Sequence, residues 1–265
     1  MSHYWKDLYK SHSSCTGKRK MYVYLYPNTS SEKSNCEAGT NITSPLYNSA
    51  ERLLNDDSIS YYAIERFEVE EYSYPKVDTS SRNTIASEFE DFLKNSNGTG
   101  SNLKSWRGSH VLVHGDSCSV DTAGGEYNDE CDDEDGSGSY PSAFSRGTMA
   151  WTGLCSDTGL RKNSSIQETL HQFIRAYQTD VHDALGDGDG DGDIDHYDEH
   201  TLGYVGSDDD VTPMLTYHGD EFDPAGRCIG SSDSPTGYDQ RLTTCTVNAV
   251  GYTADDQCDE QSHCL

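Results

Sequence analysis

The sequence has little positive charge and no long hydrophobic run. Of its 265 residues, 19 are lysine or arginine and 46 are aspartate or glutamate, which gives a formal net charge of -27 at pH 7. This charge repels nucleic acid and anionic membranes, and it favours cations, solubility and a salty medium. No stretch approaches the ~20 apolar residues that a membrane span requires. We therefore expect no nucleic-acid partner and no membrane insertion.

The cysteines lack the CxxC spacing that is typical of zinc ribbons and redox sites. Nine cysteines are many for a reducing compartment, so we interpret them as disulfides of a secreted protein. We expect at least three disulfides, with Cys118 and Cys131 as a local pair and Cys258 and Cys264 fastening the C-terminal tail. The odd count leaves one cysteine that is either free or bonded to another chain, and the connectivity does not follow from the sequence.

The chain also lacks the charged-then-apolar start of a signal sequence, so we expect a soluble or mature form of an extracellular protein. Four N-x-S/T sequons are compatible with surface glycosylation of such a protein. The candidate acceptors are Asn28, Asn41, Asn97 and Asn163.

Strand and helix patterns alternate in the N-terminal half. Strand patterns occur at 21–27, 61–72 and 109–115. Helical apolar spacing occurs at 44–56, with Ser44 as N-cap and Pro45 at the first helical position, and at 84–95. This β-α-β-α-β order predicts an α/β (α+β) fold with a largely parallel mixed sheet and crossover helices.

The second half is predicted to hold one long helix and little other regular structure. A Gly- and Asp-rich segment, 115–142, indicates an exposed loop, and 143–153 indicates one or two short strands. Apolar residues at spacings of three and four predict a helix over about 164–185. Beyond it, 241–254 is either a strand or a final helix. We therefore divide the chain into 1–185, which ends with this helix, and 186–265, an irregular subdomain held by disulfides and ions.

The long predicted helix carries Gln167-Glu168-Thr169-Leu170-His171, which differs by one residue from the HExxH motif of zinc peptidases. Gln167 and His171 are i,i+4 neighbours, and Glu168 precedes the histidine by three residues, so the three side chains project near one another. This arrangement suits zinc ligands beside a carboxylate that takes a proton from metal-bound water. Alternatively, Ser165 and Glu168 form an S-x-x-E capping box, and His171 is a hydrogen-bonded surface histidine.

The order of elements around this motif resembles the metzincins, a clan of zinc peptidases with an HExxHxxGxxH helix and a later Met-turn beneath the metal. The segment TPMLTYHG (212–219) resembles the Met-turn, with Met214 as the methionine and Tyr217 close behind it. An ordinary core methionine is the alternative for Met214. The resemblance covers roughly residues 20–220 and implies a zincin-like fold.

The motif departs from the clan at its ligand positions. Gln167 stands in place of the first zinc histidine, Ile174 in place of the glycine and Tyr177 in place of the third histidine. Tyr217 follows the methionine by three positions instead of two. His200 is the best substitute for the third ligand, and His218 is a weaker one. Because glutamine is a poor ligand, a zinc site of Gln167, His171 and His200 should bind the metal weakly.

The acidic run GDGDGDGDIDHYDEH (186–200) matches a calcium loop of the EF-hand or dockerin type. Side chains of Asp187, Asp189, Asp191, Asp195 and Asp198 and the backbone carbonyl of Asp193 occupy the ligand positions. Gly192 permits the sharp turn, and Ile194 anchors the loop to a core. A flexible acidic linker is the alternative. Closure around calcium would bring His200 toward His171.

These features predict a secreted, calcium-stabilised, metzincin-like protein with a degenerate metal site. We expect it to be a non-catalytic extracellular binding or structural component, with a protein or peptide as its ligand. One alternative is an active zinc endopeptidase with Glu168 as general base. Another is a self-assembling fibre or surface protein, suggested by the spare cysteine, the sequons and 18 tyrosines.

Overall fold

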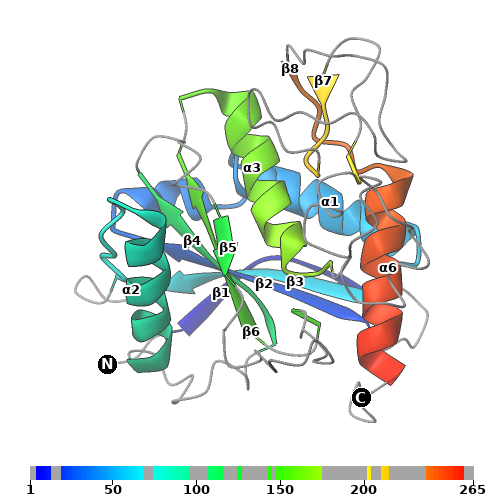
Figure 1. The fold of residues 1–265 in the computed structure, drawn as a ribbon, viewed down its shortest axis with the longest axis horizontal. Helices are drawn as coiled ribbons and strands as arrows, with labels where there is room; N and C mark the ends of the chain where they lie inside the picture. Colours follow the sequence, from blue (N-terminus) through cyan, green and yellow to red (C-terminus); the bar gives the residue numbers. More distant parts are fainter. Residues whose placement is uncertain are drawn as a thin grey trace.

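A computed structural model describes the chain at residues 4–12, 19–68, 74–95, 107–115, 124–126, 143–144, 147–154, 156–174, 202–203, 210–214 and 237–259. These residues form a mixed α/β structure in which four α-helices accompany a six-stranded sheet (Figure 1). The predicted fold class is therefore confirmed at the level of a mixed sheet with helices.

The sheet has the strand order β1-β3-β2-β4-β6-β5. Its strands are β1 (Tyr4–His12), β2 (Lys20–Pro27), β3 (Tyr61–Glu68), β4 (Gly108–His114), β5 (Gly124–Glu126) and β6 (Gly147–Gly153). The four central strands are parallel, whereas β1 pairs antiparallel with β3 and β5 pairs antiparallel with β6. Successive parallel strands need crossover connections, which α1 supplies between β2 and β3 and α2 supplies between β3 and β4.

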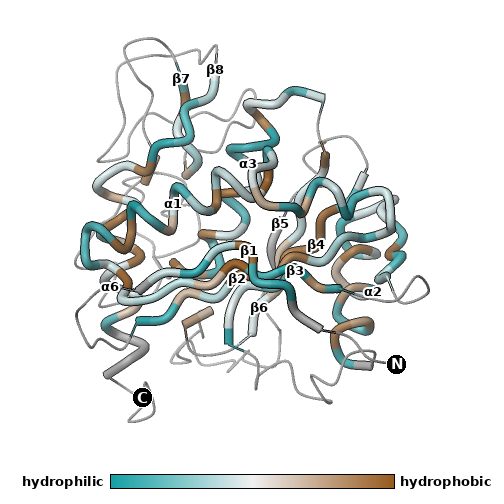
Figure 2. The backbone as a smooth tube through the Cα atoms, turned by 180° about the vertical axis from the view of Figure 1, so that it is seen from behind, coloured by the Kyte–Doolittle hydropathy of each residue, from teal (hydrophilic) through white to brown (hydrophobic). Residues whose placement is uncertain are grey.

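The helices cover both faces of the sheet. They are α1 (Thr43–Asn55), α2 (Arg82–Asn95), α3 (Thr158–His171) and α6 (Thr244–Asp259), and a short 3₁₀ helix, η1 (Glu32–Cys36), precedes α1. One core cluster joins α1, α3 and α6 to the sheet through residues such as Leu46, Leu170 and Val250. A second cluster joins α2 to the opposite face through Phe89 and Trp151. Figure 2 shows hydrophobic residues concentrated along the central strands between these layers.

Two predicted helices have different boundaries in the structure. Helix α1 begins at Thr43, whose backbone N–H donates to the Thr40 hydroxyl at 3.2 Å, so the prediction of Ser44 as N-cap was wrong. Helix α3 begins at Thr158 and ends at His171, earlier at both ends than the predicted 164–185. Its N-cap is Asp157, whose carboxylate accepts from the Leu160 N–H at 2.9 Å. Residues 175–185 of the predicted helix lie outside the described ranges.

The C-terminal helix packs into the main core. Of the two alternatives for 241–254, the structure has the helix, α6. The Ser58 hydroxyl donates to the Val247 carbonyl at 3.0 Å, and Arg19 pairs with Asp255. Most of the segment between α3 and α6 falls outside the described ranges, so the domain boundary at 185 stays a prediction. No described helix is long and apolar enough to cross a membrane.

The described cysteines are of two kinds. Cys245 in α6 is disulfide-bonded, whereas Cys36 in η1 is a free thiol with no exposed surface. The predicted pair of Cys118 and Cys131 and the tail cysteine Cys264 lie outside the described residues, as does the side chain of Cys258. The predicted disulfide-linked C-terminal subdomain therefore stays a prediction.

Candidate functional site

Helix α3 positions the motif because its apolar stripe is buried against the sheet. Ile166 and Leu170 have almost no exposed surface and share a core cluster with Ala150 of β6. Ser165 lies inside the helix, and its hydroxyl donates to the Lys162 carbonyl at 2.8 Å. The alternative that Ser165 and Glu168 form a capping box is therefore wrong, because the helix begins seven residues earlier, at Thr158.

The three motif side chains project from the last turns of α3. Gln167 and Glu168 are half-buried, and His171, the last residue of the helix, is 9% exposed. Burial raises the pKa of the Glu168 carboxyl, while the positive charges of His171 and Arg82 oppose this shift. A carboxyl with a raised pKa beside a histidine can hold or release a proton closer to neutral pH than an exposed glutamate can.

Arg82 acts electrostatically on Glu168, although no sequence motif includes it. It is the first residue of α2, and its guanidinium carbon lies 5.9 Å from the ring centroid of Trp151 in β6. This distance allows a cation–π contact, which holds the charge near the buried ring. The charge of Arg82 acts on the Glu168 carboxyl in the same direction as that of His171, although its helix packs on the opposite face of the sheet.

The described residues do not by themselves complete a zinc site. Among them, no group of three or more His, Cys, Asp or Glu side chains is arranged to hold a metal ion. Gln167 offers a neutral amide where zinc prefers imidazole or thiolate, and the positive charge of Arg82 disfavours a nearby cation. His200, the predicted third ligand, lies outside the described residues.

The segment that resembles a Met-turn is attached to α3. Met214 is fully buried in the same core cluster as Leu170. The Asn163 side-chain amide of α3 donates to the Val211 carbonyl at 2.8 Å. Val211 belongs to β7 (Asp210–Val211), which pairs in parallel with β8 (Gly237–Tyr238). The position of Met214 agrees with both the Met-turn and the core-methionine interpretations, and Tyr217 and His218 lie outside the described residues.

Glycine at position 159 lets β8 approach the start of α3. A Cβ atom on Gly159 would lie 2.8 Å from Cδ2 of Tyr238. That distance is too short for an ordinary contact, so only glycine permits this packing of Tyr238 on α3.

Two of the four predicted glycosylation sites are corrected by the structure. Asn28 is 7% exposed, and its amide donates to the Val77 carbonyl at 3.0 Å and accepts from the Val77 N–H at 2.7 Å. Asn163 is 4% exposed and is bonded to Val211. A glycan has no room on either amide in this fold. Asn41 is half-buried and stays a candidate, and Asn97 lies outside the described residues.

The whole predicted calcium loop lies outside the described residues. It comprises Asp187, Asp189, Asp191, Asp193, Asp195 and Asp198, with Gly192 and Ile194. Calcium binding there stays a prediction, and so does the approach of His200 to His171.

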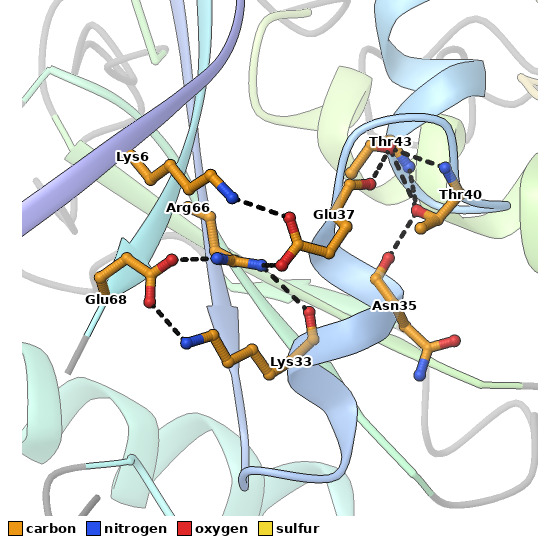
Figure 3. Close-up of polar contacts among 8 residues, drawn as sticks. All are labelled: Lys6, Lys33, Asn35, Glu37, Thr40, Thr43, Arg66 and Glu68. Atoms are coloured by element: carbon orange, nitrogen blue, oxygen red, sulfur yellow. Dashed lines mark hydrogen bonds and ion pairs between the residues drawn. The ribbon is translucent and has the colours of Figure 1, made fainter. Parts of the chain in front are cut away.

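A second polar cluster joins β1, β3 and η1 around a buried arginine (Figure 3). Arg66 is 1% exposed and pairs with Glu68 and, at 2.5 Å, with Glu37. Lys33 Nζ lies 2.8 Å from the Glu68 carboxylate, and Lys6 Nζ lies 3.0 Å from that of Glu37. Each acid in the cluster is matched by two basic side chains, so the cluster fastens η1 and the edge strand to the sheet.

Comparison of the chain with protein-family models, with curated proteins and with solved structures found no match. The described residues define the class of the fold, a mixed α/β structure with a polar group at the end of α3.

Proposed function

We propose that this protein is a secreted, calcium-stabilised, metzincin-like protein whose metal site is degenerate. It acts as a non-catalytic extracellular component that binds a protein or peptide. The observation that carries this proposal is the placement of Gln167, Glu168 and His171 on consecutive turns of one helix, with an amide at the position of a metal-binding imidazole.

The chemistry of the group favours binding over hydrolysis. Metal-assisted hydrolysis needs a cation that activates water and a carboxylate free to accept its proton. Gln167 weakens the attraction for zinc, and the charge of Arg82 acts on the Glu168 carboxyl. Both effects reduce the affinity for a divalent cation at this position.

Edge strand β5 supports a peptide as the ligand. It is the terminal strand of the described sheet, it runs antiparallel to β6, and it contacts α3. Backbone groups on such an edge can pair with an extended peptide, which would then lie beside α3. The disulfide bond of Cys245 supports an oxidising, extracellular location.

An active zinc endopeptidase is the second candidate. The observation that favours it is the adjacency of Glu168 and His171, together with the raised pKa of Glu168. Self-assembly through a spare cysteine is not supported at Cys36, because this free thiol is buried.

The decisive experiment restores the missing imidazole. We expect wild type to contain no stoichiometric zinc and to show no chelator-sensitive cleavage of casein. Gln167→His should raise zinc affinity measurably in calorimetric titration, whereas the matched control Gln167→Asn should not. Adding Arg82→Gln to Gln167→His should raise the affinity further.

Two outcomes would overturn the proposal. Stoichiometric zinc in wild type, with cleavage abolished by Glu168→Gln, would establish the peptidase. Unchanged zinc affinity in a folded Gln167→His variant would show that this helix does not carry a metzincin-like metal site.

The calcium part of the proposal has its own test. Six aspartates within the loop repel one another, so a bound divalent cation should stabilise the protein. We expect EGTA to lower the melting temperature of wild type and to leave that of an Asp187→Ala, Asp191→Ala variant unchanged. Identical melting under all conditions would favour the acidic linker.

A further inference from the structure

Edge strand β1 places one acidic side chain opposite another on β3. The two strands are antiparallel, and Asp7 is the register partner of Glu65. The register shifts between Asp7 and Tyr9, so the acidic pair lies at an irregularity of the ladder. Like charges directly opposite each other on neighbouring strands destabilise their pairing. At this position, the attachment of β1 therefore depends on whether both carboxyls are charged.

The two carboxyl groups belong to register partners and differ in exposure. Glu65 is half-buried and Asp7 is exposed. Because the charge of Asp7 acts on Glu65, ionisation of both groups together is disfavoured. The more buried group, Glu65, is the one that loses more hydration on ionisation, which makes it the favoured holder of the proton.

The groups around Glu65 offer one cation and several phenols. Lys10 of β1 is the basic side chain that acts on Glu65, and it is exposed, with its Nζ 5.8 Å from the ring centroid of Tyr61. On the other side of Glu65, Tyr24 of β2 is its register partner. The Glu65 charge also reaches Tyr22. A carboxyl flanked by aromatic rings and a second acid gains little stabilisation when it ionises.

We propose that the Asp7–Glu65 pair makes the docking of strand β1 pH-dependent, so that β1 is held tightly when Glu65 is protonated and loosens when Glu65 ionises. Other contacts keep β1 near the sheet in both states. Lys6 pairs with Glu37, and the Tyr9 hydroxyl accepts from the Gly39 N–H at 2.7 Å. Release of β1 would leave β3 as an edge whose backbone groups can pair with another strand.

The direction of the effect follows from linkage. Burial and the charge of Asp7 raise the pKa of Glu65, and Lys10 lowers it. A carboxyl with a pKa that is higher in the docked state binds its proton more tightly there than in the released state. Docking is therefore strongest at acidic pH, and it weakens as the pH rises through the pKa of docked Glu65.

Hydrogen–deuterium exchange of the β1 amides tests this proposal on the full chain. After correction for intrinsic rates, we expect wild-type β1 to exchange faster at pH 7 than at pH 5, while β2 and β4 show no such change. Glu65→Gln and Asp7→Asn should each remove the pH dependence in β1. The exposed control Asp57→Asn should keep it.

The proposal is overturned if β1 protection in wild type is the same at both pH values. It is also overturned if Asp7→Asn retains the wild-type dependence, and this variant keeps the test valid should Glu65→Gln fail to fold, because Asp7 is exposed.

Discussion

The Asn163 side chain donates a hydrogen bond of 2.8 Å to the Val211 carbonyl and so joins α3 to the segment that carries Met214. Both ends of this bond are buried: Asn163 is 4% exposed and Val211 is 2% exposed. The geometry of the motif helix and that of the Met-turn-like segment are therefore coupled through one amide.

Removing this amide should destabilise the protein. Asn163→Ala removes one of the two hydrogen bonds that the buried Val211 carbonyl accepts, the other coming from the Asp239 N–H at 2.9 Å, so we expect a loss of about 0.5–1.5 kcal/mol in the free energy of unfolding. The measurement is urea denaturation, compared with Asn48→Ala at an exposed position of α1. A loss in Asn163→Ala no larger than in Asn48→Ala would show that the bond contributes nothing to stability.

The sequence predicted helices and strands well where the spacing of apolar residues followed the buried face of the element. The alternating run ending at Pro27 and the spacing of Ile85, Phe89 and Leu93 gave β2 and α2 to within two residues. The start of α3 was missed because its signal was the cap residue Asp157, which lies well before the predicted apolar stripe that begins at Ile166. Strand β1 was not predicted, since its pairing with β3 is a long-range contact.

The candidate site was predictable only in part. Gln167, Glu168 and His171 are local in sequence, so helical spacing was enough to place them together. Arg82 comes from another helix and acts on Glu168 only through the tertiary fold, which no spacing rule reveals. The burial of Asn28 and Asn163 also depends on distant carbonyls, so the sequon pattern alone gave the wrong answer there.

Arg66 should contribute far more to stability than Lys6, although both pair with Glu37. Arg66→Met leaves Glu68 buried without its closest partner, a loss of about 3 kcal/mol in the free energy of unfolding. Lys6→Met removes an exposed pair that contributes less than about 1 kcal/mol. Urea denaturation of both variants checks this ranking, and equal losses would contradict a central role for the buried guanidinium.

The same cluster should make stability fall at acidic pH. Burial alone would raise the pKa of Glu68, but hydrogen bonds from Lys33 and Arg66 lower it below its ordinary value. A depressed pKa gives stability that is present above the unfolded-state pKa, about 4.3 for glutamate, and is lost as the pH falls through the folded-state pKa.

Glu68→Gln should therefore be less stable than wild type at pH 7, and the two proteins should converge as the pH falls below about 4. The measurement is the free energy of unfolding across this pH range. A constant difference between the proteins would mean that Glu68 contributes through packing and not through its charge.

The two described cysteines should respond oppositely to unfolding and to reduction. Burial raises the pKa of the Cys36 thiol and excludes reagents from it, so we expect no alkylation in the native protein. Guanidinium without reductant should expose Cys36 and allow its alkylation, whereas Cys245 should be alkylated only after a reductant opens its disulfide. Mass spectrometry of peptides carrying each residue distinguishes the two cases within one sample. Alkylation of Cys245 before reduction would contradict its bonded state, and rapid alkylation of Cys36 in the native protein would show that η1 opens readily from the core.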